Sequence, residues 1–226
     1  MQLRIELTVI SQTAISVGAG GSIATIADKS IVRDGWGRPL IPGSQVKGKL
    51  RWAAEQLLRG LGKDIPAPFE GAQREEHDTP VRQLFGSPMS RSPLFFAHLP
   101  GIIGDLSQAE SIRAQPTQHL SQIRPSVTIN RHRRTAAESL LLFQETALET
   151  TRFHSSRAIT GQINDLSQAA LLWIAARLSS RWGGAKSRGL GWAKVETNVF
   201  VDGQACTEDE LRTALRALIA DVGGRP

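Results

Sequence analysis

The chain has 226 residues, and 40% of them are apolar, which is enough to bury the core of one large domain. Its single cysteine, Cys206, excludes a disulfide framework and a zinc ribbon within this chain. The first residues lack the apolar stretch of a signal peptide, and no apolar run reaches the roughly 20 residues that span a bilayer. We therefore expect a soluble cytoplasmic protein that binds no zinc and contacts no membrane.

The net charge is +6, and the positive charge is concentrated in two parts of the chain. Residues 29–63 hold eight Lys or Arg against two acids, and residues 177–194 hold five against none. Basic charge gathered in this way is expected where a phosphate backbone binds. An ordinary solvated surface is the alternative explanation.

In chain order, residues 2–10 alternate apolar and polar side chains, which predicts a half-buried strand. A short strand is predicted at 30–33 and a turn at 39–43. Ser44 is the expected N-cap of a helix that Gly60 and Gly62 end. Residues 63–126 predict irregular structure.

In the second half, a strand is predicted within 139–149, a helix at 165–180 and a strand at 193–201. Thr207 and Glu210 then form a capping box for a last helix that runs to about residue 220. This order predicts an α+β fold with a ferredoxin-like (RRM-like) β-α-β-β-α-β core. We expect one domain over 1–226: a core at about 1–62 and 160–201, an insertion at about 63–159 and a C-terminal helix at about 207–220.

The segment from Ile41 to Arg51 contains the G-x-x-x-x-G-K pattern of a phosphate-binding loop. Leu50, however, stands where such a loop needs a Ser or Thr to bind magnesium, which argues against a nucleotide hydrolase. The segment is better explained as the start of a helix, where backbone amides attract phosphate. Helical spacing puts Lys47 and Arg51 on one face and Lys49 on another. The candidate phosphate contacts here are Gly43, Ser44, Lys47, Lys49 and Arg51.

The segment from Gly183 to Gly191 holds four glycines in nine residues. Glycine lets the backbone approach a ligand closely and adopt positive φ. A loop of this kind between a helix and a strand can wrap a sugar-phosphate backbone without reading its sequence. The candidate contacts here are Gly184, Lys186, Ser187, Arg188 and Gly189.

Together these motifs resemble those of the RAMP superfamily. Segment 41–51 is similar to the signature near the first helix of that family, 183–191 to its C-terminal glycine-rich loop, and 84–86 to a short motif between them. The resemblance covers about residues 1–201. Within the superfamily, segments 26–34 and 127–151 resemble the loop and the thumb of the backbone subunit of type III CRISPR effector complexes.

This resemblance implies a RAMP-type fold with a thumb inside 63–159, on which Arg131 and Arg133 contact RNA. It also implies three classes of partner: crRNA, complementary target RNA, and other effector subunits packed head to tail. The family's catalytic loop aspartate falls on Asp28, which implies metal-dependent cleavage of target RNA with Mg²⁺ or another divalent cation, and Asp28 as a metal ligand. From chemistry alone, an aspartate in a polar loop is more commonly a turn or capping residue. Asp34, before Gly35 in an apparent turn, is the poorer candidate.

Three alternatives stay open. The chain could hold RNA without cutting it, process guide RNA as an endoribonuclease, or bind no RNA and act as a scaffold. Metal-free processing needs a histidine near the first helix, and residues 1–76 contain none. The five tryptophans are expected mostly in the core, with Trp36 and Trp182 as candidates for stacking on a base because they flank basic loops.

Overall fold

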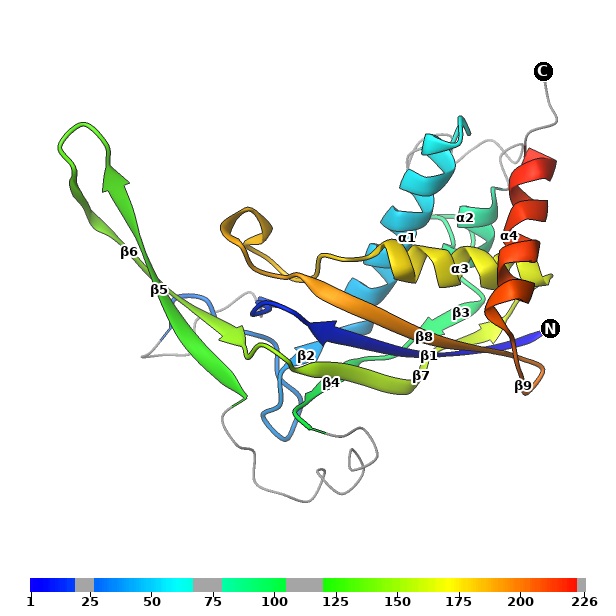
Figure 1. Ribbon diagram of the computed structural model, residues 1–226, viewed down its shortest axis with the longest axis horizontal. Coiled ribbons are helices and arrows are strands. Elements are labelled where there is room, and N and C mark those ends of the chain that lie inside the picture. Colours follow the sequence, from blue (N-terminus) through cyan, green and yellow to red (C-terminus); the bar gives the residue numbers. More distant parts are fainter. Residues whose placement is uncertain (19–26, 67–78, 105–119, 223–226) are drawn as a thin grey trace.

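The computed structural model describes residues 1–18, 27–66, 79–104 and 120–222. Its main sheet is antiparallel with the order β2-β4-β7-β1-β8-β9, and β3 also pairs with β7. Helices α1, α3 and α4 lie on one face of this sheet (Figure 1). The elements of this body are β1 (Gln2–Ser11), β2 (Leu40–Ile41), α1 (Gly43–Gly60), α2 (Pro80–Phe85), β3 (Leu94–Phe96), β4 (Leu99–Ile102), β7 (Arg152–Gln162), α3 (Leu166–Leu178), β8 (Ala193–Val201), β9 (Gln204–Ala205) and α4 (Glu208–Val222).

The arrangement of these elements confirms the predicted ferredoxin-like fold. Strand β1 lies between β7 and β8, α1 follows β1, and α3 connects β7 to β8. The boundary of the core expected near residue 160 falls inside β7, which begins at Arg152. None of the described helices is long and apolar enough to cross a membrane.

The core lies between the sheet and the helices. On β1, alternate residues Leu3, Ile5 and Leu7 are at most 1% exposed, because the period of a strand turns them all toward the helices. Helix α1 buries a stripe at helical spacing, which includes Val46 and Leu50. Helix α3 is buried on more than one side, since it packs against α1, β8 and α4. The helix predicted at 165–180 is therefore present, and apolar residues occupy most of its circumference.

Three local predictions are wrong. Ser44 is not the N-cap: α1 begins at Gly43 after Pro42, and the Gly43 N–H donates to His98 Nδ1 at 3.1 Å. Residues 30–33 form isolated bridges rather than a strand. The range 63–126, predicted irregular, contains α2, β3, β4 and the start of a further strand. These elements are short and depend on pairing with distant strands, so a local pattern does not reveal them.

A two-stranded hairpin extends away from this body (Figure 1). Its strands are β5 (Ser121–Asn130) and β6 (Thr135–Ala147), so the strand predicted within 139–149 is the second half of a longer one. At the turn, Asn130 Oδ1 accepts hydrogen bonds from the N–H groups of His132 and Arg133. Every residue of β5 except Ser121 is exposed. The hairpin therefore has no core of its own.

Candidate functional site

The glycine-rich loop after α3 has a defined backbone. Residues Lys186–Arg188 form a single 3₁₀ turn, flanked by Ala185 at φ 51° and Gly189 at φ 82°. A Cβ on Gly191 would lie 2.1 Å from the Trp182 carbonyl oxygen, so the fold itself requires this glycine. Gly184 is different: a Cβ there would meet only one atom, at 3.6 Å. The fold therefore does not require glycine at this position, where the N–H already donates to the Ser16 carbonyl at 2.7 Å.

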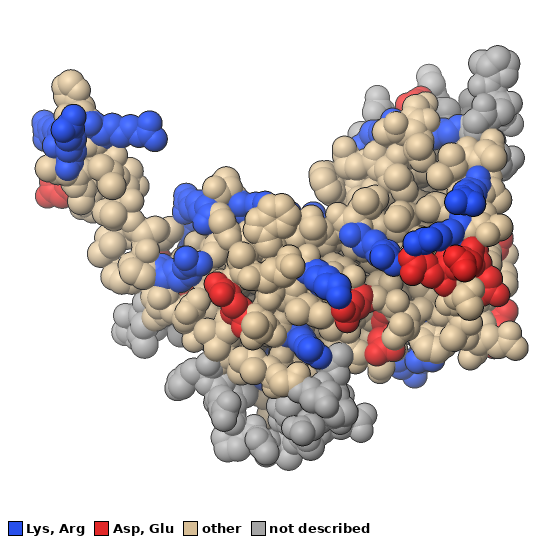
Figure 2. Space-filling view, viewed as in Figure 1, with Lys and Arg blue, Asp and Glu red and all other residues tan. Residues whose placement is uncertain are grey.

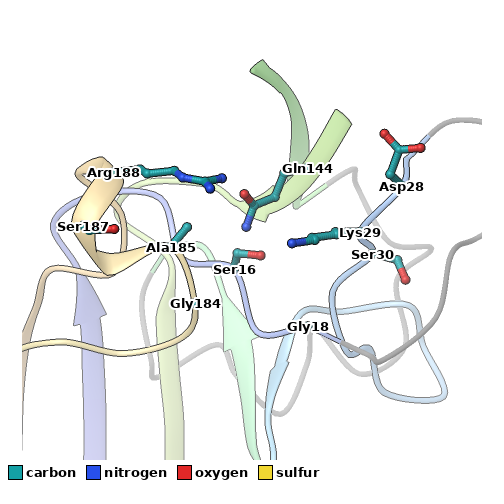
Figure 3. A pocket seen from close by; sticks show the side chains of 10 residues that line it. All are labelled: Ser16, Gly18, Asp28, Lys29, Ser30, Gln144, Gly184, Ala185, Ser187 and Arg188. Carbon is teal, nitrogen blue, oxygen red and sulfur yellow. The ribbon is translucent and has the colours of Figure 1, made fainter. Parts of the chain in front are cut away.

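This loop separates two pockets of similar size, about 760 and 750 Å³. The first pocket brings the loop together with Asp28, which lies more than 150 positions earlier in the chain. In Figure 3, the side chains of Lys29, Gln144 and Arg188 point into the pocket, and Asp28 stands at its rim. The residues that line it are Ser16, Gly18, Asp28, Lys29, Ser30, Gln144, Gly184, Ala185, Ser187 and Arg188.

Asp28 is fixed to the hairpin by two hydrogen bonds. The Phe143 N–H donates to Asp28 Oδ2 at 2.8 Å, and the Asp28 N–H donates to the Phe143 carbonyl at 2.9 Å. The Glu145 N–H also donates to the Lys29 carbonyl at 2.8 Å, so residues 28–29 run alongside β6. One oxygen of the Asp28 carboxylate thus anchors the backbone of β6, a capping role of the kind that the residue type predicts.

Glu145 strengthens the same connection. Its carboxylate forms an ion pair with Arg33 and accepts hydrogen bonds from the Ser121 hydroxyl at 2.8 Å and the Ile31 N–H at 3.1 Å. Burial alone would raise the pKa of Glu145, but the Ile31, Ser121 and Arg33 donors together lower that pKa. This cluster, which we call the hairpin clasp (Glu145, Arg33, Ser121 and the Ile31 N–H), ties the Asp28 loop to both strands of the hairpin.

The second pocket lies between α1 and the other side of the loop. Burial, together with the nearby cations Lys186 and Arg181, lowers the pKa of Lys49 in this pocket. The Arg181 guanidinium stacks on Trp192 at 4.0 Å from the ring centre. The lining residues are Gln45, Gly48, Lys49, Trp52, Leu178, Ser180, Arg181, Trp182, Gly183 and Lys186.

The other candidates on α1 lie apart from both pockets. Arg51 forms an ion pair with Glu55 at 2.9 Å and donates to the Gly86 carbonyl at 3.1 Å. The Lys47 ammonium stands 5.8 Å from the centre of the Phe96 ring, and burial and Arg51 lower its pKa. Among the α1 lysines of the described chain, it is therefore Lys49 that joins the glycine-rich loop. Contacts of Lys47 and Arg51 with RNA stay predictions.

Gly43 and Ser44 also have defined surroundings. A Cβ on Gly43 would lie 2.1 Å from the Phe96 carbonyl oxygen, so close packing against β3 requires the glycine. Its N–H is already bonded to His98, which leaves no free donor for phosphate at that position. Ser44 is exposed in the first turn of α1.

Arg131 and Arg133 lie in the turn at the far end of the hairpin. Figure 2 shows Lys and Arg side chains gathered at that tip, and others along the floor of a broad hollow between the hairpin and the helices. The hairpin cations are thus separated from Asp28, which pairs with Phe143, by residues 135–142 of β6. They can contact RNA only at a different point from the loop residues.

The tryptophans differ from the sequence prediction. Trp182 is fully buried and its Nε1–H donates to the Ser179 carbonyl at 2.7 Å, which excludes it as a stacking platform. Trp36, Trp52 and Trp192 are 54%, 53% and 43% exposed, so Trp52 and Trp192 were missed as surface aromatics. Only contacts across the fold decide which of these rings is covered.

Asp34 lies in the turn that the sequence indicated, whereas His98 lies at a place that the sequence did not reveal. Asp34 accepts hydrogen bonds from the N–H groups of Trp36 and Arg38 and pairs with the Arg38 guanidinium, which confirms its role in a turn. His98 lies against the first residue of α1, although no histidine precedes residue 77 in the sequence. A histidine is therefore present beside the start of α1, although residues 1–76 contain none.

Asp28 alone does not make a divalent cation site. Within the described ranges, no group of three or more His, Cys, Asp or Glu side chains could hold a metal ion. Mg²⁺ requires near-octahedral oxygen coordination, and a single carboxylate fills a small part of it. The residues that the structure describes therefore do not fit a protein-only metal centre.

Comparisons with known proteins agree with the fold and the loops. A family model described as the RAMP superfamily matches residues 6–194. The chain is also 40% identical over 81 residues to a Mycobacterium tuberculosis protein named "CRISPR system Cms endoribonuclease Csm3". That match spans 35% of this chain and 32% of the relative, about a third of each. Because the family model covers most of its length, the chain belongs to the RAMP superfamily.

Proposed function

We propose that the chain is a crRNA-binding backbone subunit of a type III CRISPR effector complex and cuts complementary target RNA at Asp28. One observation carries the proposal: a single pocket unites Asp28 with Gly184, Ser187 and Arg188 of the glycine-rich loop. Membership of the RAMP superfamily and the name of the Mycobacterium tuberculosis relative support the type of complex.

The RNA backbone crosses the glycine-rich loop in this proposal. Gly184 is exposed and adds no side chain to the loop surface, and Lys186 and Arg188 are exposed cations beside it. Lys29 points into the pocket from the opposite wall (Figure 3). Such contacts bind sugar and phosphate without reading the bases, which suits a subunit that must hold any guide.

Cleavage uses the 2′-hydroxyl of the target RNA as the nucleophile. The Asp28 carboxylate accepts the proton of this hydroxyl while its oxygen attacks the adjacent phosphorus. The bond from phosphorus to the 5′ oxygen breaks, leaving a 2′,3′-cyclic phosphate and, once protonated, a 5′-hydroxyl. Lys29 and Arg188 offset the charge that develops on the phosphoryl oxygens. Dependence on Mg²⁺ or another divalent cation stays a prediction, in which RNA phosphates would have to complete the coordination.

Assembly with neighbours is the second part of the proposal. The hairpin exposes apolar side chains that have no core to enter, among them Ile129 at 61% and Leu141 at 54%. We propose that a neighbouring subunit covers them, in a head-to-tail contact that continues into a filament. Sedimentation of the purified chain with and without its guide RNA measures this assembly.

The test of cleavage compares Asp28→Asn with Asp28→Ala in the assembled complex. Asparagine removes the carboxylate base but keeps an oxygen that accepts the Phe143 N–H, whereas alanine removes both. We expect Asp28→Asn to slow cleavage of labelled complementary RNA at least about 100-fold, the range of a lost general base. RNA binding should stay within about twofold of wild type.

A wild-type rate in both variants would remove catalysis and leave a subunit that only holds RNA. Parallel reactions with a chelator and with added Mg²⁺ test the metal prediction. His98 lies beside the start of α1, where a metal-free processing enzyme would need a histidine, so the processing alternative is tested as well. Metal-independent cutting of guide precursor by the chain alone, lost in His98→Ala, would favour processing over target cleavage.

A further inference from the structure

The second pocket combines strong positive charge with unsatisfied polar atoms. Lys49, Arg181 and Lys186 meet there, and none of the described residues that line the pocket is acidic. Within the described part of the chain, the buried atoms Gln45 Oε1 and Arg181 Nε have no hydrogen-bond partner. A buried polar atom without a partner costs free energy. Arg181 Nε needs an acceptor and Gln45 Oε1 needs a donor, so these two atoms point to a polar ligand that carries both kinds of group.

Gly48 supplies a second, independent observation. It lies in the second turn of α1, where glycine is less stable than alanine by about 1 kcal/mol. A Cβ on Gly48 would meet no protein atom within 4 Å, so the packing of the chain does not require glycine here. The residue lines the second pocket. The packing of the chain thus gives no reason for a glycine at this position. A ligand that passes close to the helix would give one.

Trp52 is the third observation. Its ring lines the pocket, is 53% exposed and has the Lys49 ammonium 4.6 Å from its centre. An exposed indole beside a cation offers a flat apolar face for a base and a positive charge for its phosphate. Nucleic acid bases stack on such faces whatever their sequence. A neighbouring protein side chain would cover the ring but leave three cations unpaired.

We propose that the second pocket holds one nucleotide of the bound single-stranded RNA, with its base on Trp52, its phosphate on Lys49 and Lys186, and its backbone passing over Gly48. Gln45 Oε1 accepts a hydrogen bond from the base or the ribose, and Arg181 Nε donates to the phosphate. The inference rests on the proposed RNA binding and adds a site for a base on the far side of the glycine-rich loop from Asp28.

The first test measures binding of a labelled single-stranded RNA to the full chain by fluorescence anisotropy. Trp52→Ala should weaken binding roughly tenfold, within the range of one base–aromatic stack. Phe95→Ala is the matched control, because Phe95 on β3 is also an exposed aromatic, at 67%, and lines neither pocket. The control should stay within about twofold of wild type. RNA of equal length with abasic sites should bind wild type and Trp52→Ala equally.

Salt dependence separates the base from the phosphate. Trp52→Ala should leave the slope of log affinity against log salt unchanged, because it removes no phosphate contact. Lys49→Gln should reduce that slope by about one. An unchanged slope in Lys49→Gln would contradict the phosphate part of the proposal.

Gly48→Ala should change thermal stability and RNA affinity in opposite directions. The variant should raise the melting temperature by a few degrees, since alanine favours the helix by about 1 kcal/mol. It should nonetheless bind RNA several-fold more weakly, because the new methyl group stands where the RNA backbone passes. Equal or tighter RNA binding would overturn the site.

Failure of this site is distinguishable from failure of RNA binding as a whole. If wild type binds RNA with a steep salt dependence and Trp52→Ala binds equally well, only the nucleotide pocket is wrong. If wild type binds no RNA, the proposed function falls with it. Loss of self-association in Trp52→Ala, with RNA affinity intact, would make Trp52 a protein interface. Competition by adenosine monophosphate as effective as by the RNA itself would identify a free-nucleotide site instead.

Discussion

The body and the hairpin of this chain are held in place by different forces. The main sheet and its helices enclose an apolar core, in which Leu3, Leu7 and Leu50 are fully buried. The hairpin buries little along β5 and connects to the body through the hairpin clasp, Asp28 and the backbone pairing of Ala147 with Ile15. Packing therefore determines the stability of the body, whereas a few polar contacts at its base determine the position of the hairpin.

The largest expected effect is on the body. Gly43→Ala should destabilise the chain by about 3 kcal/mol, because its Cβ would lie 2.1 Å from a backbone oxygen that cannot move freely. Gly60→Ala, at the other end of α1, has open space around it and is the matched control. Denaturant unfolding of both variants measures the difference. Equal stability would mean that β3 can shift away from α1.

Loss of the hairpin clasp should have an intermediate and local effect. Glu145→Gln removes the ion pair with Arg33 and weakens two further hydrogen bonds, at a cost of about 1–3 kcal/mol to the docking of the hairpin. Hydrogen exchange should quicken at the Ile31 and Phe143 amides and stay slow in β1. Glu149→Gln, at an exposed position, is the control. Equal acceleration in β1 would show that body and hairpin unfold together.

Acid should release the hairpin in the same way. The folded pKa of Glu145 lies below the ordinary value of 4.5, so its stabilising contribution is present above about pH 4.5 and is lost as the pH falls through the folded pKa. Hydrogen exchange at the Ile31 amide, corrected for its intrinsic pH dependence, should therefore rise at low pH in wild type. Glu145→Gln should show no such added dependence.

The smallest effect is expected on the exposed faces of the hairpin. Leu141→Thr should change the stability of the isolated chain by less than about 0.5 kcal/mol, because Leu141 is 54% exposed. The variant should weaken assembly with neighbouring copies, measured by sedimentation. Leu171→Ala in the body, by contrast, should be about as destabilising as Gly43→Ala, at about 3 kcal/mol. Unchanged assembly in Leu141→Thr would argue against a neighbour on this face.

The sequence allowed prediction of the elements that local patterns define. Strand β8 has the predicted bounds, and Thr207 and Glu210 form the predicted reciprocal capping box. Helical spacing also correctly separated Lys49 from Lys47 and Arg51.

Contacts between distant segments could not be predicted in this way. The pairing of Asp28 with Phe143 and the position of His98 beside α1 depend on tertiary structure, which leaves no periodic signal in the sequence. For the same reason, the sequence identified both basic segments but not the pocket that α1 and the loop form together. Burial of Trp182 and exposure of Trp52 follow from the same long-range packing.

The paired hydrogen bonds between residues 28 and 143 attach the candidate catalytic carboxylate directly to the hairpin. A displacement of the hairpin, whether by a ligand at Arg131 and Arg133 or by a neighbouring subunit, would therefore act on the position of Asp28 through β6. The orientation of the Asp28 carboxylate would thus depend on what binds the hairpin. The isolated chain already holds Asp28 against Phe143, so a neighbour that binds the hairpin would either shift this carboxylate or hold it more firmly.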